Sequence, residues 1–205
     1  MLTLVAINGI DSESESLKNV KALTLSAREK KFDKILFLTA RKVKCEYEQI
    51  EIPALTLQQY NTFSVYELHK YISTEYALNV QTDGYVLNGD LWMDEFLNYD
   101  YIGAAWIRSF LLGHGISAKN LVGNSGFCLR SKKFMMSSAQ LPVTSKRYND
   151  DILFCINHYE LMMKKYGIKY APVELAEKFS FELYKTGNTF GFHGKHLDES
   201  RKLCL

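Results

Sequence analysis

The sequence predicts an α/β fold: a mixed, mostly parallel sheet flanked by helices. Two short, mostly apolar runs, Leu2–Ile7 and Lys34–Thr39, have the composition of strands buried on both faces, and Ser12–Lys31 between them has apolar residues at helical spacing. A strand, a helix and a strand in this order form the unit from which parallel sheets are built. The chain has 205 residues, 47% of them hydrophobic, which suffices for one well-buried domain. We therefore expect residues 1–205 to form a single domain.

The rest of the chain extends this pattern. Residues 47–52 alternate as an edge strand, 64–76 have the spacing of a second amphipathic helix, and 79–86 form a strand that runs into a turn at Asp83-Gly84. Further on, the patterns predict strands at 101–106, 127–129 and 168–171, short helices at 91–99 and 131–138, and a long helix at 150–166. Residues 109–120 indicate a mobile loop, and 179–194 a closing glycine-rich segment.

Charge and composition exclude several classes of protein. Lys and Arg number 25 against 23 Asp and Glu, so no net charge favours nucleic acid as a partner. No apolar stretch approaches the roughly 20 residues of a membrane span, and the start of the chain lacks the pattern of a signal peptide. The four cysteines are far apart and form no CxxC pair, which favours free thiols in a reducing compartment. We expect a soluble, cytoplasmic protein.

Asp83 is the first candidate for a binding role. Ligands of open α/β sheets bind beyond the carboxyl ends of the strands, which is where this carboxylate is predicted to lie. With Gly84 beside it, the carboxylate could accept a divalent cation or a ribose hydroxyl with little steric hindrance. Asp-Gly is also a good turn dipeptide, so the pair alone leaves a structural role open.

The run Gly123, Asn124, Ser125 and Gly126, here called the glycine loop, is a second candidate. Glycine-rich turns let backbone N–H groups approach a phosphate or a sugar. The run is neither GxGxxG nor a P-loop, so it indicates neither dinucleotide binding nor ATP hydrolysis. A plain turn is the alternative.

Two more candidates follow late in the chain. Asp150 and Asp151, the acid pair, open the predicted long helix, where one Asp is the expected cap and the second could act as a general base. His193 lies between Gly191-Phe192 and Gly194. It could bind a metal or a phosphate, although an isolated histidine is more often structural. The signatures GxSxG and HExxH are absent, which disfavours acyl transfer of the hydrolase type and zinc proteolysis.

Taken in chain order, these motifs resemble those of GT-A-fold glycosyltransferases. More narrowly, the sequence is similar to a poorly characterised glycosyltransferase-like family of that fold in its segments QTDG (81–84), DYIGAAW (100–106), VGNSGFCLRS (122–131), NDD (149–151) and FGFHG (190–194). The resemblance covers most of the chain. It implies transfer of a sugar from a nucleotide-diphosphate sugar to an acceptor hydroxyl, with surface polysaccharide or glycan synthesis as the setting.

The resemblance also implies roles for single residues. Asp83, followed by Gly84, matches the last acid of the Asp-x-Asp motif, which holds a divalent cation (Mn²⁺ or Mg²⁺) and the donor diphosphate, and His193 matches a histidine that supports them. The glycine loop matches the loop beside the donor sugar. Asp150 and Asp151 match the acidic pair of the family, the second of which is the usual catalytic base in inverting members. Asn8, at the end of the first strand, would lie near the nucleotide base.

One departure from the family pattern affects the metal. Gln81 occupies the position of the first acid in Asp-x-Asp, and an amide is a weaker ligand than a carboxylate. Metal dependence is therefore open, and so is a non-catalytic nucleotide- or glycan-binding domain on the same fold. A nucleotidyltransferase on a similar sheet is a third possibility, which the lack of a basic, glycine-rich turn after the first strand disfavours.

Overall fold

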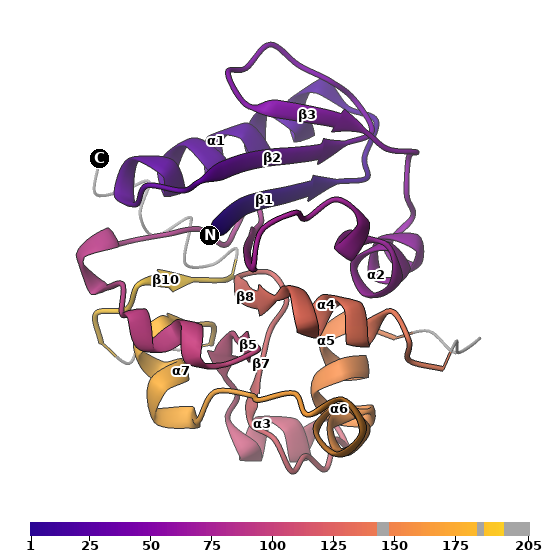
Figure 1. The fold of residues 1–205 in the computed structure, drawn as a ribbon, viewed down its shortest axis with the longest axis vertical. Helices are drawn as coiled ribbons and strands as arrows, with labels where there is room; N and C mark the ends of the chain where they lie inside the picture. The colour runs from indigo at the N-terminus through magenta and orange to yellow at the C-terminus, as the bar shows by residue number, and fades with distance from the viewer. Residues whose placement is uncertain (143–147, 184–186, 195–205) are drawn as a thin grey trace.

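A mixed six-stranded sheet with helices around it forms the frame of the protein (Figure 1). The computed structural model describes residues 1–142, 148–183 and 187–194. The strand order is β3-β2-β1-β4-β8-β5. These strands span Leu2–Asn8 (β1), Lys34–Thr39 (β2), Glu48–Glu51 (β3), Tyr76–Val80 (β4), Tyr101–Ile102 (β5) and Cys128–Ser131 (β8). The predicted fold class, an α/β fold with a mixed, mostly parallel sheet flanked by helices, is confirmed.

The direction of the strands divides the sheet into two parts. β3, β2, β1 and β4 are parallel to one another, whereas β8 runs antiparallel to both of its neighbours. In Figure 1 the arrowheads of β1, β2 and β3 point to the same side of the molecule. All seven residues of β1 are buried, as the apolar run predicted for a central strand.

Helices and short segments connect the strands. The helices span Glu13–Glu29 (α1), Leu57–Tyr66 (α2), Arg108–Gly113 (α3), Lys132–Ser138 (α4), Asp150–Ile152 (α5), Tyr159–Tyr166 (α6) and Val173–Phe179 (α7). Short 3₁₀ helices span Leu68–Lys70 (η1), Gly89–Leu91 (η2) and Asp94–Asn98 (η3). Two small ladders pair Ala104–Ala105 (β6) with Val122–Gly123 (β7), and Ser180–Phe181 (β9) with Gly191–Phe192 (β10).

The prediction of a helix over residues 64–76 was wrong. α2 begins at Leu57 behind a capping box in which Thr56 and Gln59 bond each other's backbone N–H, and it ends at Tyr66. Its buried face includes Asn61 and Ser64 as well as apolar residues, and both polar side chains hydrogen-bond to the segment 148–150. Because this buried face is partly polar, the apolar residues of α2 do not recur at a clear helical spacing, and the sequence pattern misplaced the helix.

The long helix predicted over 150–166 is in fact interrupted. α5 passes at once into a π-helical turn, η4 (Leu153–Asn157), and α6 starts only after His158. π-Helical turns inside helices are frequent at functional sites. The predicted capping by an Asp was also wrong, because Asn149 holds the N-cap position and Asp150 follows it inside the helix.

Two smaller predictions also need correction. Part of the predicted loop 109–120 is helical, since α3 covers residues 108–113. The predicted strand at 168–171 contributes a single bridge, from Tyr170 to Tyr101. Of the described residues, Cys45, Cys128 and Cys155 are free thiols, and Cys204 lies outside the described ranges. Within those same ranges the structure contains no helix with the length and apolar character that crossing a membrane requires.

Candidate functional site

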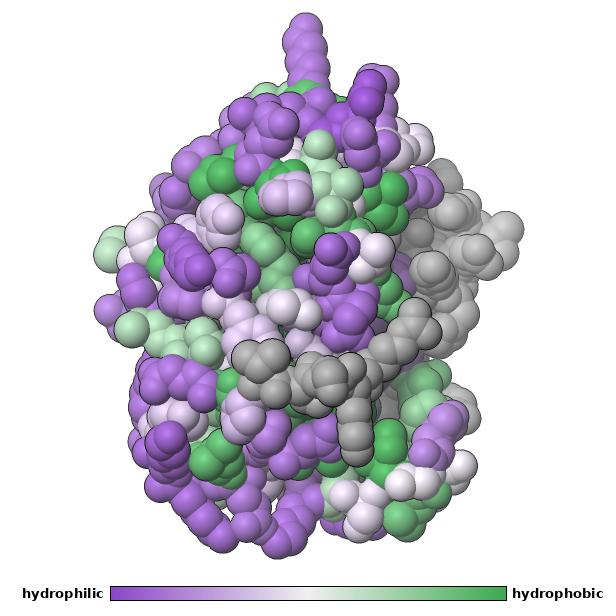
Figure 2. Space-filling model, turned by 90° about the vertical axis from the view of Figure 1, so that its right-hand side faces the viewer, coloured by the Kyte–Doolittle hydropathy of each residue, from purple (hydrophilic) through white to green (hydrophobic). Residues whose placement is uncertain are grey.

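A cleft of about 480 Å³ opens at the carboxyl ends of β1 and β4. β2 extends the sheet on one side of β1 and β4 on the other, so the cleft lies at the switch point where α/β sheets bind ligands. Its lining comprises Ile7, Asn8, Gly9, Ile10, Glu15, Asn19, Leu55, Leu57, Tyr60, Gln81, Thr82, Asp83 and His193. Figure 2 shows this side of the molecule, where hydrophilic residues cover most of the surface and apolar residues lie among them in the upper half.

Asn8 lines the cleft, and its side-chain amide bonds to the segment that follows β1. Its amide donates to Ile10 O and Ser16 Oγ, both at 3.0 Å, and its Oδ1 accepts from Ile10 N–H at 3.0 Å. Next to it, a Cβ at Gly9 would lie 2.6 Å from Leu55 Cβ, so only glycine allows this close approach. The amide of Asn8 therefore serves to fold the loop after β1, while the residue contributes to the cleft wall.

Gln81 is held in a fixed orientation by Tyr60 of α2. Its Nε2 donates to the Tyr60 hydroxyl at 2.8 Å, and its Oε1 faces His193 Nε2 at 3.3 Å. Burial raises the pKa of Tyr60, so the hydroxyl stays protonated. The neutral residue in the place of an acid thus directs an oxygen toward His193.

Asp83 and His193 both line the cleft, and their side chains lie close to each other. Asp83 Oδ1 lies 3.7 Å from His193 Nε2. Both atoms could bind a divalent cation, and Gln81 Oε1 could supply a third ligand. Carboxylate, imidazole and amide oxygen suit Mn²⁺ or Mg²⁺. Across the described residues, however, no three His, Cys, Asp or Glu side chains form a metal cluster, so waters or phosphate oxygens would have to complete the coordination.

The glycine loop is organised around Asn124, a residue in the left-handed region with φ 66°. Its Oδ1 accepts from Gly126 N–H at 2.9 Å, and its Nδ2 lies 2.9 Å from His193 Nδ1. Asn79 of β4 anchors the loop by donating to Ser125 O at 2.7 Å. The loop therefore uses one of its own N–H groups internally and holds the imidazole through a side chain.

Three glycines near the cleft leave space for the side-chain rings of His193 and Trp106. A Cβ at Gly126 would overlap the imidazole of His193, and one at Gly123 would overlap the indole of Trp106. Gly84 also contacts the imidazole, since a Cβ there would lie 2.9 Å from His193 Cδ2. The glycines that the sequence indicated as approach points for a ligand thus serve first as packing surfaces for His193 and Trp106.

Glu182 is a site residue that sequence reasoning missed. It directly follows β9, accepts from Trp106 Nε1–H at 3.1 Å, and its Oε1 lies 3.7 Å from His193 Nδ1. Burial alone would lower the pKa of His193, but the hydrogen bond to Glu182 and the charge of Asp83 outweigh it, and the pKa is raised. Burial would likewise raise the pKa of Glu182, yet its interactions with His193 leave it lowered. No local motif marks Glu182, because its partners lie 76 and 11 positions away in the chain.

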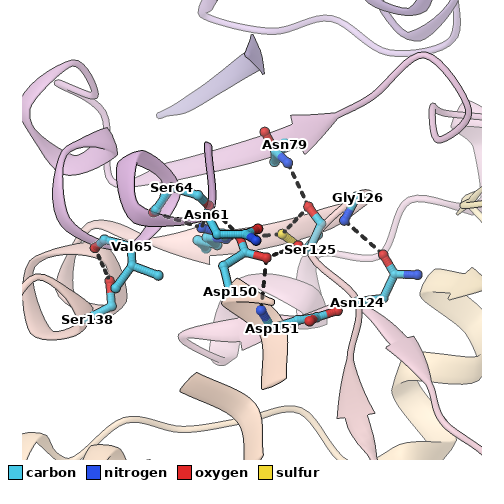
Figure 3. A network of polar contacts seen from close by, with 12 residues as sticks. Asn61, Ser64, Val65, Asn79, Asn124, Ser125, Gly126, Ser138, Asp150 and Asp151 are labelled. Carbon is cyan, nitrogen blue, oxygen red and sulfur yellow. Dashed lines mark hydrogen bonds and ion pairs between the residues drawn. The ribbon is translucent and has the colours of Figure 1, made fainter. Parts of the chain in front are cut away.

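The acid pair divides into two different environments. Asp150 is 2% exposed, and its carboxylate is surrounded by donors (Figure 3). Oδ1 accepts from Ser125 Oγ at 2.5 Å and from Asp151 N–H at 2.9 Å, while Oδ2 accepts from Ser64 Oγ at 2.5 Å and Arg130 Nη2 at 3.3 Å. Asp150 is thereby committed to protein partners.

Asp151 is half-buried, and charged side chains near it influence its pKa. Burial, together with the charge of Asp150, raises its pKa to about 7. Glu182 and His193 are close enough to influence that pKa as well. A carboxylate with a pKa near neutrality is suited to take up a proton. The structure thus brings Asp83, His193, Glu182 and Asp151 into one electrostatic cluster.

Comparison with solved structures supports the fold. The chain resembles a glycosyltransferase involved in glycosylation of the major capsid of PBCV-1, with a TM-score of 0.56, 12% identity, and 98% of each chain covered. It also resembles galactosyltransferase LgtC in complex with donor and acceptor sugar analogs (0.51, 13%, 95% of this chain and 87% of that one) and mouse xyloside xylosyltransferase 1 (0.50, 12%, 95% and 98%). At such identities the likeness establishes the fold alone.

Other comparisons define the family without defining an activity. The chain covers 48% of the bifunctional IspDF from Campylobacter jejuni at a TM-score of 0.47, so that likeness carries no functional inference. No curated protein matches the sequence. Residues 44–193 match the model of a family described as "Protein of unknown function (DUF5672)". Because the match spans more than half of the chain, the protein belongs to the DUF5672 family.

Proposed function

We propose that the protein, as one domain, is a glycosyltransferase that moves a sugar from a nucleotide-diphosphate sugar to an acceptor hydroxyl. The observation that carries the proposal is the cluster of Asp83, His193, Glu182 and Asp151 beside a cleft at the switch point of the sheet. Such a cleft suits the nucleotide, and the cluster offers separate groups for the two ends of the reaction. The glycosyltransferases among the structural neighbours support the proposal at the level of fold.

The donor would lie with its diphosphate beside Asp83 and His193. Gln81, Asp83 and His193 would hold Mn²⁺ or Mg²⁺, which when bound neutralises charge on the leaving diphosphate. Without a bound cation, the raised pKa of His193 favours an imidazolium, which would supply positive charge at the same place, whereas a His193 that binds the cation would be neutral. Asn124 positions the imidazole and Gly84 and Gly126 give it room. The nucleotide base would occupy the end of the cleft near Asn8 and Gly9.

Asp151 would act as the base. The acceptor oxygen forms a bond to the anomeric carbon, its proton passes to a carboxylate oxygen of Asp151, and the bond to the diphosphate breaks with its electron pair on the leaving oxygen. The raised pKa of Asp151 favours proton uptake near neutral pH. Asp150 is assigned no contact with substrate, because its oxygens are occupied by donors of the protein.

A panel of nucleotide sugars, with and without Mn²⁺, tests the proposal. We expect wild-type protein to release nucleoside diphosphate from at least one donor, and Asp151→Asn to lose at least a thousandfold in turnover while its Kd for the nucleoside diphosphate changes less than threefold. Full activity of Asp151→Asn would refute the role of the base. Binding without turnover across all donors and acceptors would favour the non-catalytic alternative.

A further inference from the structure

Arg130 and Asp150 form a buried ion pair that the reaction itself does not use. Arg130 Nη2 lies 3.3 Å from Asp150 Oδ2, and the two residues are 1% and 2% exposed. Removing one partner of a buried ion pair is strongly destabilising, yet replacing the whole pair by well-packed apolar residues is often neutral or stabilising. Stability alone therefore does not explain why this site contains an ion pair.

The cation is itself fully enclosed. Arg130 Nη1 donates to Ser64 O at 3.3 Å and to Ser64 Oγ at 3.0 Å, and Nε donates to Cys128 Sγ at 3.2 Å. Its guanidinium carbon lies 4.9 Å from the centre of the Phe154 ring in η4. Strand β8, helix α2 and turn η4 thus fix Arg130 from three sides, and Arg130 and Ser64 together fix Oδ2 of Asp150.

The other oxygen of Asp150 joins the two halves of the candidate site. Oδ1 accepts from the Ser125 hydroxyl, which belongs to the glycine loop, and from the backbone N–H of Asp151. Ser125 is flanked by Asn124, which holds His193, and by Gly126, on which the imidazole packs. Oδ1 of Asp150 therefore bonds both to the glycine loop, beside which the donor sugar would lie, and to the backbone of the proposed base, Asp151 (Figure 3).

We propose that Asp150, held by Arg130, is a positioning residue that sets the place of Asp151 relative to the glycine loop and His193. The inference rests on the proposed function for its effect on catalysis, but the coupling itself is a property of the folded chain. The hydroxyl of Ser125 and the N–H of Asp151 meet at one oxygen, so a change at either end displaces the other. An error of about 1 Å in the position of a catalytic group can lower a rate about a hundredfold.

The chain offers a matched pair of buried serines for the test. Ser125→Ala removes one hydroxyl that bonds Asp150, whereas Ser138→Ala removes a hydroxyl that bonds Val65 O at 3.0 Å on α2 and does not contact Asp150. Both serines are at most 9% exposed, so each variant loses buried hydrogen bonding of one hydroxyl, to a carboxylate in Ser125→Ala and to the backbone carbonyls of Val65 and Met135 in Ser138→Ala. Neither change removes Arg130 or Asp150, so the ion pair keeps both of its partners and we expect both variants to fold.

Two measurements decide the proposal. In Ser125→Ala we expect hydrogen exchange of the Asp151 amide to accelerate at least tenfold, and kcat to fall at least tenfold with less than a threefold change in KM for the donor. Ser138→Ala should leave the exchange of Asp151 and kcat unchanged, although its Tm also falls because a buried hydroxyl is lost. Equal exchange rates of the Asp151 amide in the two variants would overturn the proposal. If wild-type protein transfers no sugar, the proposed function fails, and the exchange rates alone decide the positioning role.

Discussion

His193 packs its imidazole directly on the backbone of Gly126, with no space for even a methyl group between them. The two residues are far apart in the chain, and the contact places the ring against the glycine loop, where Asn124 Nδ2 reaches Nδ1. The position of the imidazole therefore depends on the absence of a side chain at residue 126.

Gly126→Ala should displace His193 from the cleft wall. We expect the Kd for the nucleoside diphosphate product to rise at least tenfold, because the imidazole can no longer face Asp83. Gly113→Ala is the matched control, since no described atom lies within 4 Å of the position that its Cβ would take. Isothermal titration calorimetry measures both variants, and an unchanged Kd in Gly126→Ala would contradict the assignment of His193 to the diphosphate.

The pH dependence of the rate should follow Asp151. Burial and the charge of Asp150 raise its pKa to about 7, and a base works only when it is deprotonated. We expect kcat to rise about tenfold for each pH unit below that pKa and to level off above it. The measurement is kcat at saturating donor from pH 5.5 to 9. A rate that stays constant down to pH 5.5 would exclude Asp151 as the base.

The same raised pKa predicts an effect on stability. An unfolded Asp titrates near its ordinary value of 3.8, so between that pH and about 7 the folded protein binds the extra proton. The stabilising effect of this protonation is fully present below pH 3.8 and is lost as the pH rises through 7. Asp151→Asn should therefore have a higher Tm than wild type at pH 8, and the difference should vanish near pH 4. Thermal unfolding at both pH values measures it; a lower Tm for the variant at pH 8 would indicate that the ionised carboxylate stabilises the fold.

Glu182→Gln should lower the pKa of His193. Glu182 contributes a hydrogen bond and a negative charge that favour the imidazolium, while the glutamine can still accept the proton of Trp106 Nε1. The His193 Hε1 resonance, followed by NMR over the pH range, gives the pKa directly. Glu177→Gln is the control, because Glu177 lines the adjoining pocket beside Trp106 and is not among the groups that shift the pKa of His193. Equal pKa values in wild type and Glu182→Gln would contradict the assigned coupling.

Gln81→Glu should tighten the binding of a divalent cation. The substitution places a second carboxylate beside Asp83, and carboxylates are better ligands for Mn²⁺ than amides. We expect the Kd for Mn²⁺ in the presence of a nucleoside diphosphate to fall at least tenfold, and Asp83→Asn to raise it by at least the same factor. Titration calorimetry with Mn²⁺ measures both. If neither variant changes the Kd, the cation does not bind at Gln81 and Asp83.

The parts of the fold that were predictable are those in which a local pattern decides the structure. β1 and β2 are buried on both faces, so their apolar runs predicted them with nearly correct ends. α2 was misplaced because Asn61 and Ser64 face inward, where they bond to residues 148–150 of a distant segment. A polar residue that is satisfied inside the protein looks like a surface residue in the sequence.

The candidate site was predictable only in part, for a related reason. Glycines beside Asp83, Asn124 and His193 drew attention to those residues, and the structure places Asp83 and Asn124 next to the imidazole of His193. Glu182 and Tyr60 carry no local signal, since their roles arise from contacts that form only when distant segments meet. Arg130, which pairs with the buried member of the acid pair, likewise gives no local signal, because it belongs to the distant strand β8.

The antiparallel course of β8 has a consequence for how the site is assembled. In a parallel sheet, the loop before a strand lies at the edge opposite to the loop after its neighbour. Because β8 runs against β4, Cys128 at its beginning pairs with Asn79 near the end of β4, and the loop before β8 arrives at the edge where Gln81 and Asp83 leave. A single reversed strand thus brings an incoming and an outgoing loop to one edge of the sheet, so that changes in the length of the loop after β4 or of the loop before β8 act on the same small region.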